Sequence, residues 1–120
     1  RVKIGVRIAK EYADDEDAFS KKIYDVIGSG VGIIESVPAA VSIAYYTQDP
    51  NKCCLMCANL GGDTDTIGAM ATAICGAFVG YSKINPEYTE LLRVQNPETD
   101  FEEYINILEK GRELLGCERL

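Results

Sequence analysis

The sequence predicts an all-α protein. Apolar residues recur at helical spacing in most segments, prolines stand at several expected helix starts, and no convincing strand pair or Asn-Gly hairpin turn is present. The 120 residues are enough for one modest domain with its own core. Since no internal repeat or linker divides them, we expect a single domain of packed helices.

The first two helices are expected on either side of an acidic patch. Residues 2–13 combine strand-like alternation with helical spacing, and we favour a helix there. The acidic residues 14–17 precede a periodic segment that stops at the breaker 28–30. The apolar residues of this segment are Phe19, Ile23, Val26 and Ile27. The patch is compatible with a metal loop, but an N-cap followed by an acidic first turn is favoured.

Three further helices are expected to start at a proline, because a first turn does not need the missing N–H. One begins near Ser36, with Pro38 close behind, and two begin at the Asp-Pro and Asn-Pro pairs 49–50 and 85–86. A last helix follows Thr99 or Asp100 as its cap, and Gly116 closes it. Its apolar stripe consists of Phe101, Ile105, Leu108 and Leu115.

The segment 67–79 is unusually rich in glycine and alanine. Glycine inside a helix costs roughly 1 kcal/mol relative to alanine, so it usually marks a close approach by a neighbour. We expect this helix to be buried on nearly all sides. If neighbours do approach the helix closely, Gly68→Leu or Gly76→Leu should destabilise by more than the propensity cost, through overpacking.

Composition excludes several classes of function. The net charge is −7, with 19 acidic and 12 basic residues and no basic stripe, so a nucleic-acid partner is not expected. No apolar run is long enough to suggest a membrane span. The chain has no histidine, which excludes Ser-His and Cys-His nucleophile pairs within it.

The number and spacing of the cysteines also bear on function. The count of five is odd, and Cys53, Cys54 and Cys57 are crowded together. They either form part of a soft-metal site or are small apolar residues on a closely packed helix; the second interpretation is favoured because no histidine and no second CxxC complete a zinc site. Free buried thiols suggest a reducing compartment, hence the cytoplasm.

Two carboxylates and two hydroxyls stand at the start of the glycine-rich helix, in residues 63–66. One interpretation is helix capping, for which Asp and Thr are both suited. The other is a site for a hard cation such as Mg²⁺, because Asp63, Asp65 and the hydroxyl of Thr66 can converge on one ion. From the residues alone, capping is the more economical explanation.

Two segments resemble the ADP-ribosylglycohydrolase family. The stretch LGGDTDTIGAMATAICGAFVG is similar to the family signature, and the upstream GSGVGIIESVPAAVSIAYY is similar to the segment that precedes it. The similarity covers most of residues 28–93 and looks closest to the ADP-ribosylserine hydrolase branch. It implies a compact orthogonal helical bundle that holds two divalent cations, Mg²⁺ or Mn²⁺, and cleaves the glycosidic bond between ADP-ribose and a protein side chain.

The resemblance also implies roles for individual residues. Asp63 and Asp65 match two carboxylate ligands of the metals, Thr66 matches a hydroxyl ligand, and Gly62 matches the glycine of the preceding tight turn. The capping interpretation yields to the metal interpretation on this ground.

The upstream segment carries the weaker assignments. Ser29, Gly30 and Val31 match positions that border the bound ribose, although this stretch is also explained as a simple helix break. Glu35 is interpreted as structural rather than catalytic, since acids are favoured at a helix start.

One departure from the family pattern matters. Family members carry a Thr-Asp-Asp ligand cluster and the general acid or base far upstream, and neither is present here. Residues 1–120 are therefore interpreted as the C-terminal portion of one longer domain, with half of a two-metal site and no activity alone. Expected partners are the missing N-terminal portion and an ADP-ribosylated protein or small ADP-ribosyl compound. The alternative is a non-catalytic member with a structural or ADP-ribose-binding role.

Overall fold

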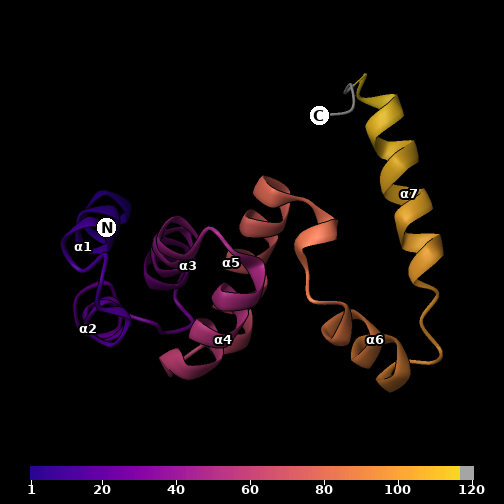
Figure 1. Ribbon diagram of the computed structural model, residues 1–120. Coiled ribbons are helices and arrows are strands. Elements are labelled where there is room, and N and C mark those ends of the chain that lie inside the picture. Colours follow the sequence, from indigo (N-terminus) through magenta and orange to yellow (C-terminus); the bar gives the residue numbers. More distant parts are fainter. Residues whose placement is uncertain (117–120) are drawn as a thin grey trace. The chain divides into compact units, whose positions relative to one another are not determined.

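The computed structural model describes residues 1–116, and helices form nearly all of its regular structure (Figure 1). No strand occurs in that range, and the all-α prediction is confirmed. The elements are α1 (Val2–Glu11), α2 (Glu16–Lys22), the π-helical turn η1 (Ile23–Ile27), α3 (Ile33–Thr47), α4 (Pro50–Leu60), α5 (Thr64–Val79), the 3₁₀ turn η2 (Tyr81–Lys83), α6 (Pro86–Gln95) and α7 (Phe101–Leu114).

Contacts divide the chain into two compact units, one from Arg1 to Asn85 and one from Pro86 onwards. All predicted site residues lie in the first unit. In the second unit, three of the four residues of the expected apolar stripe are exposed, namely Ile105, Leu108 and Leu115, and Leu108 retains 73% of its accessible surface. The assignment of residues 1–120 to one domain stays a prediction.

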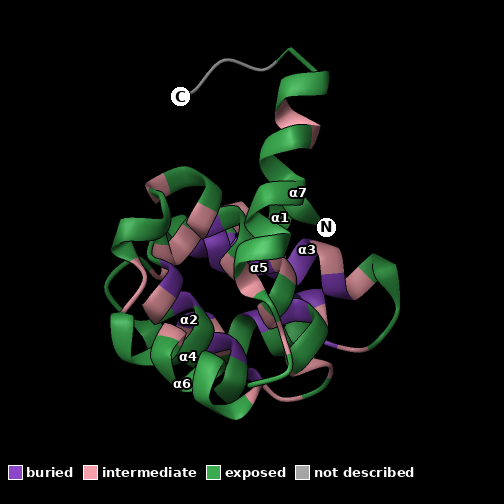
Figure 2. Ribbon diagram, turned by 90° about the vertical axis from the view of Figure 1, so that its right-hand side faces the viewer, coloured by how far each residue is buried: buried purple, intermediate pink, exposed green. Residues whose placement is uncertain are grey.

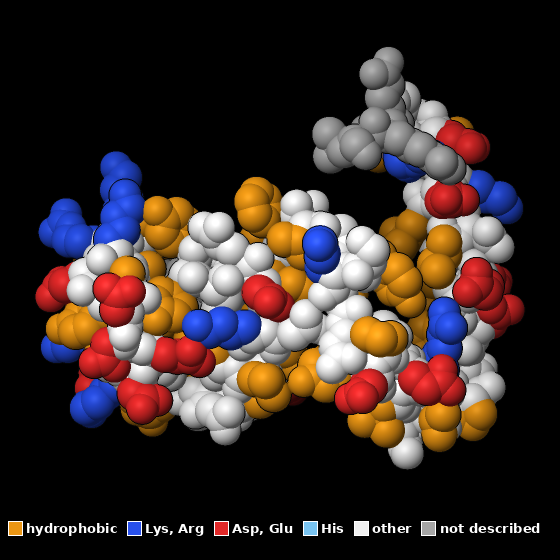
Figure 3. All heavy atoms as spheres, in the orientation of Figure 1, with side chains coloured by type: hydrophobic (Ala, Val, Ile, Leu, Met, Phe, Trp, Pro, Cys, Tyr) orange, Lys and Arg blue, Asp and Glu red, His pale blue; other side chains and the backbone are white. Residues whose placement is uncertain are grey.

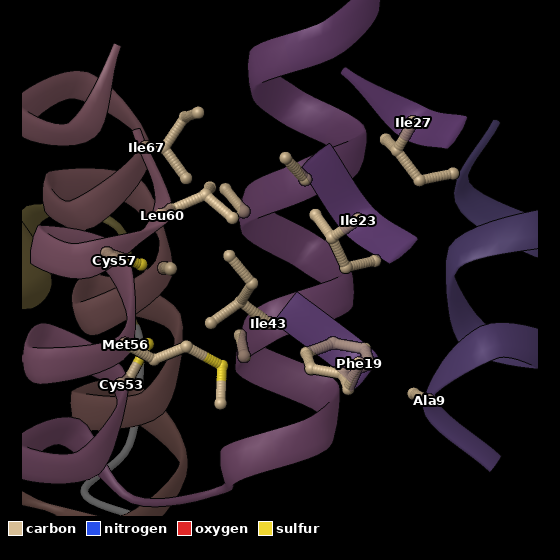
Figure 4. Packing of buried hydrophobic residues seen from close by; sticks show 14 of the residues in the cluster. Ala9, Phe19, Ile23, Ile27, Ile43, Cys53, Met56, Cys57, Leu60 and Ile67 are labelled. Carbon is tan, nitrogen blue, oxygen red and sulfur yellow. The ribbon is translucent and has the colours of Figure 1, made fainter. Parts of the chain in front are cut away.

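The core of the first unit is built around α3, which packs against α1, η1, α4 and α5. Ile43 of α3 lies between Phe19 and Ile23 on one side and Met56 of α4 on the other (Figure 4). Buried residues of the first unit gather on the inner faces of its helices (Figure 2). The buried apolar residues are Ile8, Ala9, Phe19, Ile23, Ile27, Ala39, Ala40, Ile43, Ala44, Cys53, Met56, Cys57, Leu60, Ile67, Ala71 and Cys75.

Most helix starts agree with the prediction. Asp15 caps α2 by accepting the N–H of Ala18 at 3.0 Å, so the acidic patch acts as an N-cap. Asp49 caps α4 ahead of Pro50, and Asp100 caps α7 by accepting the N–H of Glu103. These starts were predictable because a cap depends on residues within one turn.

Two details differ from the prediction. Helix α3 begins at Ile33 rather than near Ser36, because the Gly32 carbonyl already accepts the N–H groups of residues 35 and 36. Pro38 therefore lies inside the helix. Val26, expected on the apolar face, is 50% exposed because η1 winds as a π-helix and shifts that face.

Helix α5 also differs from the expectation that it is buried on nearly all sides. In the first unit only one stripe is buried, formed by Ile67, Ala71 and Cys75. A Cβ on Gly68 would meet the Cβ of Cys57 at 3.4 Å, an ordinary contact, and a Cβ on Gly76 would meet nothing within 4 Å. The expected close approach at Gly76 is therefore wrong for this chain.

Gly5 allows a close contact between α1 and α3. A Cβ on Gly5 would overlap the Ser42 side chain, coming within 2.8 Å of its Cβ. Ser42 is fully buried, and its hydroxyl donates to the Pro38 carbonyl at 2.6 Å, so it has little freedom to move. The glycine therefore sets the distance between the two helices.

Gly5→Ala is expected to destabilise the chain by about 1–3 kcal/mol, the usual cost of overpacking. Gly76→Ala is the matched control: it replaces a helical glycine with open space around it and should stabilise by up to about 1 kcal/mol. Urea unfolding of both variants measures the difference. If the two variants had equal midpoints, the packing of α1 on α3 would be looser than described.

The described cysteines support the packing interpretation of the cysteine cluster. Cys53, Cys57 and Cys75 are buried in the core, whereas Cys54 is exposed. A hydrogen bond with Cys57 and burial raise the pKa of Cys53, and the same bond lowers the pKa of Cys57. Cys117 lies outside the described residues.

Charged side chains are mixed on the surface of the first unit. On the face shown in Figure 3, both basic and acidic groups are present over α1 and α2. Ion pairs join Lys21 to Asp25 and Lys52 to Glu16, both at 2.9 Å. Within residues 1–116, no helix combines the length and the apolar character needed to cross a membrane.

Candidate functional site

The turn between α4 and α5 brings the predicted metal residues to the start of α5. Gly61 and Gly62 both have positive φ, +84° and +77°, which glycine adopts without strain. A Cβ on Gly62 would collide with the carbonyl oxygen of Ser29, so the turn packs directly on the 28–32 loop. Glycine at position 62 is therefore required both by its conformation and by its neighbour.

A backbone hydrogen bond joins the two predicted segments. The N–H of Asp63 donates to the carbonyl of Ser29 at 2.7 Å. Ser29 is 5% exposed, whereas Val31, two residues further along, is 86% exposed. The structure thus places the segment predicted to border the ribose beside the first residue predicted to bind metal.

Asp63 occupies the N-cap position of α5 but does not act as a cap. Its carboxylate accepts no backbone N–H of the helix, in contrast to Asp15, Asp49 and Asp100, which all do. Instead, the hydroxyl of Thr66 donates to its Oδ1 at 3.1 Å. This contrast favours a function for Asp63 other than capping, because the carboxylate forgoes the usual cap bond.

The second carboxylate is held in a similar way. The backbone N–H of Thr66 donates to Oδ1 of Asp65 at 2.9 Å. This bond, followed by the contact with the Asp63 side chain, lowers the pKa of Asp65, so the group remains anionic at neutral pH. Asp65 and Thr66 are exposed in this chain, not sunk in a cleft.

The donor set suits a hard cation, but it is incomplete. Asp63, Asp65 and Thr66 offer two carboxylates and a hydroxyl within four residues, the oxygen ligands that Mg²⁺ and Mn²⁺ prefer. Among residues 1–116, no three His, Cys, Asp or Glu side chains are grouped to hold a metal ion. These three residues would supply only part of the coordination shell that such an ion needs.

Comparison with known families identifies the chain. A sequence model described as ADP-ribosylglycohydrolase matches residues 2–116. The chain belongs to the ADP-ribosylglycohydrolase family. The match extends over both site segments, so the DTDT turn and the 28–32 loop are parts of a family domain and not a chance short motif.

Individual relatives agree with this assignment. The chain is 46% identical over 114 residues to the uncharacterised protein YegU of Escherichia coli K12, which covers 94% of this chain and 34% of that protein. It is 34% identical over 90 residues to ADP-ribosylhydrolase ARH3 of Xenopus tropicalis, covering 66% of this chain and 26% of that protein. Identity to ADP-ribosylarginine hydrolase Tri1 of Serratia proteamaculans is 31% over 96 residues, covering 69% and 26% respectively.

The chain spans about a third of the length of YegU (34%) and about a quarter of ARH3 (26%). No solved structure matches the chain.

Sequence reasoning missed how Glu35 acts in this site. The residue was expected just before a helix start, but it lies inside the first turn of α3, which begins earlier than predicted. Its carboxylate, however, accepts the N–H of Gly30 at 2.9 Å, inside the loop that carries Ser29. The spacing of five residues between Gly30 and Glu35 gives no recognised signal for such a bond.

Proposed function

We propose that this family member takes part in hydrolysis of the glycosidic bond that joins ADP-ribose to a protein side chain or a related ADP-ribosyl compound. Asp63, Asp65 and Thr66 would supply half of a site for two divalent cations, Mg²⁺ or Mn²⁺. When bound, the cations would supply Lewis-acid stabilisation of the charge that develops as the bond breaks. Family membership and the names of the relatives ARH3 and Tri1 support the reaction class.

The observation that carries the proposal is the bond between Asp63 and Ser29. It fixes the carboxylate turn against the loop expected to border the ribose, at 2.7 Å between backbone atoms. The carboxylate of Asp63 accepts no backbone N–H of α5, which keeps oxygen lone pairs available for an ion. Together these features hold an anionic ligand set in a defined place before any ion binds.

The loop residues take different parts in this proposal. Ser29 is buried and acts through its backbone carbonyl, while the N–H of Gly30 is engaged by Glu35. Val31 is exposed and is the residue of the three whose side chain is free to touch the ribose. We place the general acid or base, and the remaining metal ligands, in an N-terminal portion outside residues 1–120.

The free, buried thiols of Cys53, Cys57 and Cys75 fit a reducing compartment, and we propose the cytoplasm as the location. Since relatives named as ARH3 and as an arginine hydrolase both match the chain, the proposal concerns the bond to ADP-ribose that their substrates share.

Residues 1–120 alone are expected to release no ADP-ribose from a modified protein in the presence of Mg²⁺. Two carboxylates and one hydroxyl leave most of the shell of two ions to water, and ions held so loosely are poorly positioned for catalysis. Addition of the N-terminal portion, as a separate chain or in the full-length protein, should restore metal binding and turnover. Released ADP-ribose is the measured quantity.

Two outcomes would contradict this picture. Robust turnover by the lone chain would mean that a complete site lies within it. A full-length protein that binds ADP-ribose but never releases it from protein would support the non-catalytic alternative.

A further inference from the structure

Glu35 connects three parts of the first unit through its two carboxylate oxygens. Oε2 accepts the N–H of Gly30 at 2.9 Å. Oε1 lies 3.6 Å from Nη1 of Arg1, which in turn donates to the carbonyl of Ile27 at 2.8 Å. The 28–32 loop is therefore held at its beginning through Arg1 and in its middle through Glu35.

The loop is shaped around this carboxylate. A Cβ on Gly28 would lie 2.6 Å from Cδ and Oε2 of Glu35, and a Cβ on Gly30 would lie 2.8 Å from Oε2. Both distances are shorter than real Cβ contacts, so a side chain at either position would displace the Glu35 carboxylate. The two glycines leave the space that the glutamate fills, so loop and carboxylate fit each other on two sides.

Ser29 stands between these two glycines, and its carbonyl accepts the N–H of Asp63. Two hydrogen bonds therefore connect Glu35 to Asp63: the Gly30 N–H donates to Glu35, and the Asp63 N–H donates to the Ser29 carbonyl. We propose that Glu35 is a positioning residue for Asp63: it holds the loop in the conformation that places the Ser29 carbonyl against the Asp63 amide. The proposal rests on the proposed function only where it concerns metal affinity.

The test compares Glu35→Ala and Glu35→Gln with a matched control. Glu16→Ala also removes a first-turn glutamate that makes an ion pair, with Lys52 at 2.9 Å, but on α2 and away from the loop. In the 120-residue chain, amide hydrogen exchange at Gly30 and Asp63 is measured by NMR without metal. Binding of Mn²⁺ is then followed in the full-length protein by paramagnetic broadening of the amide signals of residues 63–67.

Glu35→Ala should abolish the exchange protection of the Gly30 and Asp63 amides while the core amides of α3 remain protected. It should weaken Mn²⁺ binding about tenfold, the low end of the usual effect of residues that support a metal ligand. Glu35→Gln should restore most of both, because its amide oxygen can still accept the Gly30 N–H. Glu16→Ala should resemble the parent in both measurements.

Unchanged protection at Asp63 in Glu35→Ala would overturn the positioning role. So would lost protection with unchanged Mn²⁺ affinity, since the loop would then not govern the ligand. If the full-length parent protein shows no Mn²⁺ broadening at residues 63–67, the proposed metal site fails, whereas the exchange measurements on the 120-residue chain still decide whether Glu35 positions Asp63.

Discussion

Gly62→Ala is expected to destabilise the chain by about 2–6 kcal/mol, more than the overpacking change Gly5→Ala alone. Two costs add: a positive φ of +77° strains an alanine by about 1–3 kcal/mol, and the new methyl group would collide with the Ser29 carbonyl oxygen. Backbone cannot swing aside as a flexible side chain can, so the Asp63–Ser29 bond should break. Urea unfolding gives the stability, and amide exchange at Asp63 reports the bond.

Gly80→Ala separates the two costs. Gly80 has a similar φ of +86°, but a Cβ there would meet nothing within 4 Å. It should therefore show the backbone strain alone, and the difference between the variants is the cost of the collision with Ser29. Equal destabilisation in both would show that the turn does not pack on the 28–32 loop.

In the full-length protein, Asp63→Ala and Asp65→Ala should each abolish hydrolysis and weaken Mg²⁺ or Mn²⁺ binding by at least about a hundredfold. Each removes an anionic ligand, a larger loss than the roughly 10–100-fold typical of residues behind the ligands. Thr66→Ala should cost less, because a neutral hydroxyl contributes less charge. Calorimetric titration measures the affinity.

The free energy of unfolding distinguishes a metal-binding role of Asp63 from a capping role. Asp49→Ala removes a true cap and should cost about 1 kcal/mol in unfolding free energy without affecting metal affinity. Asp63 makes no cap bond, so Asp63→Ala should cost much less stability than Asp49→Ala. The reverse order, with metal binding unchanged in both Asp63→Ala and Asp65→Ala, would return the DTDT motif to simple capping.

The sequence was most informative where structure depends on neighbours within one turn. Asp15, Asp49 and Asp100 were predictable as caps, and so was the start of α4 at Pro50. The role of Pro38 was not, because a proline shortly after the first turn of a helix looks locally like one at its start. The early start at Ile33 depends on the Gly32 carbonyl and on the packing of α3.

The same distinction between local and long-range structure applies to the candidate site. Crowding of Asp63, Asp65 and Thr66 was visible from the sequence because they lie together in one turn. The bond between Asp63 and Ser29 joins residues far apart in the chain, and no pattern in either segment specifies it. The exposure of the outer face of α5 was not predictable from its composition either. A composition rich in glycine and alanine predicts burial, whether or not the chain contains the helices that would cover that face.

The buried thiols allow opening of the core to be measured by the rate at which they react. Cys53, Cys57 and Cys75 are at most 1% exposed, on two helices that pack together, while Cys54 on the same helix as the first two faces solvent. An alkylating reagent should label Cys54 at once and the three core thiols only in molecules whose core has opened. The slow labelling rate then gives the free energy of that opening under native conditions, without denaturant and without any introduced probe.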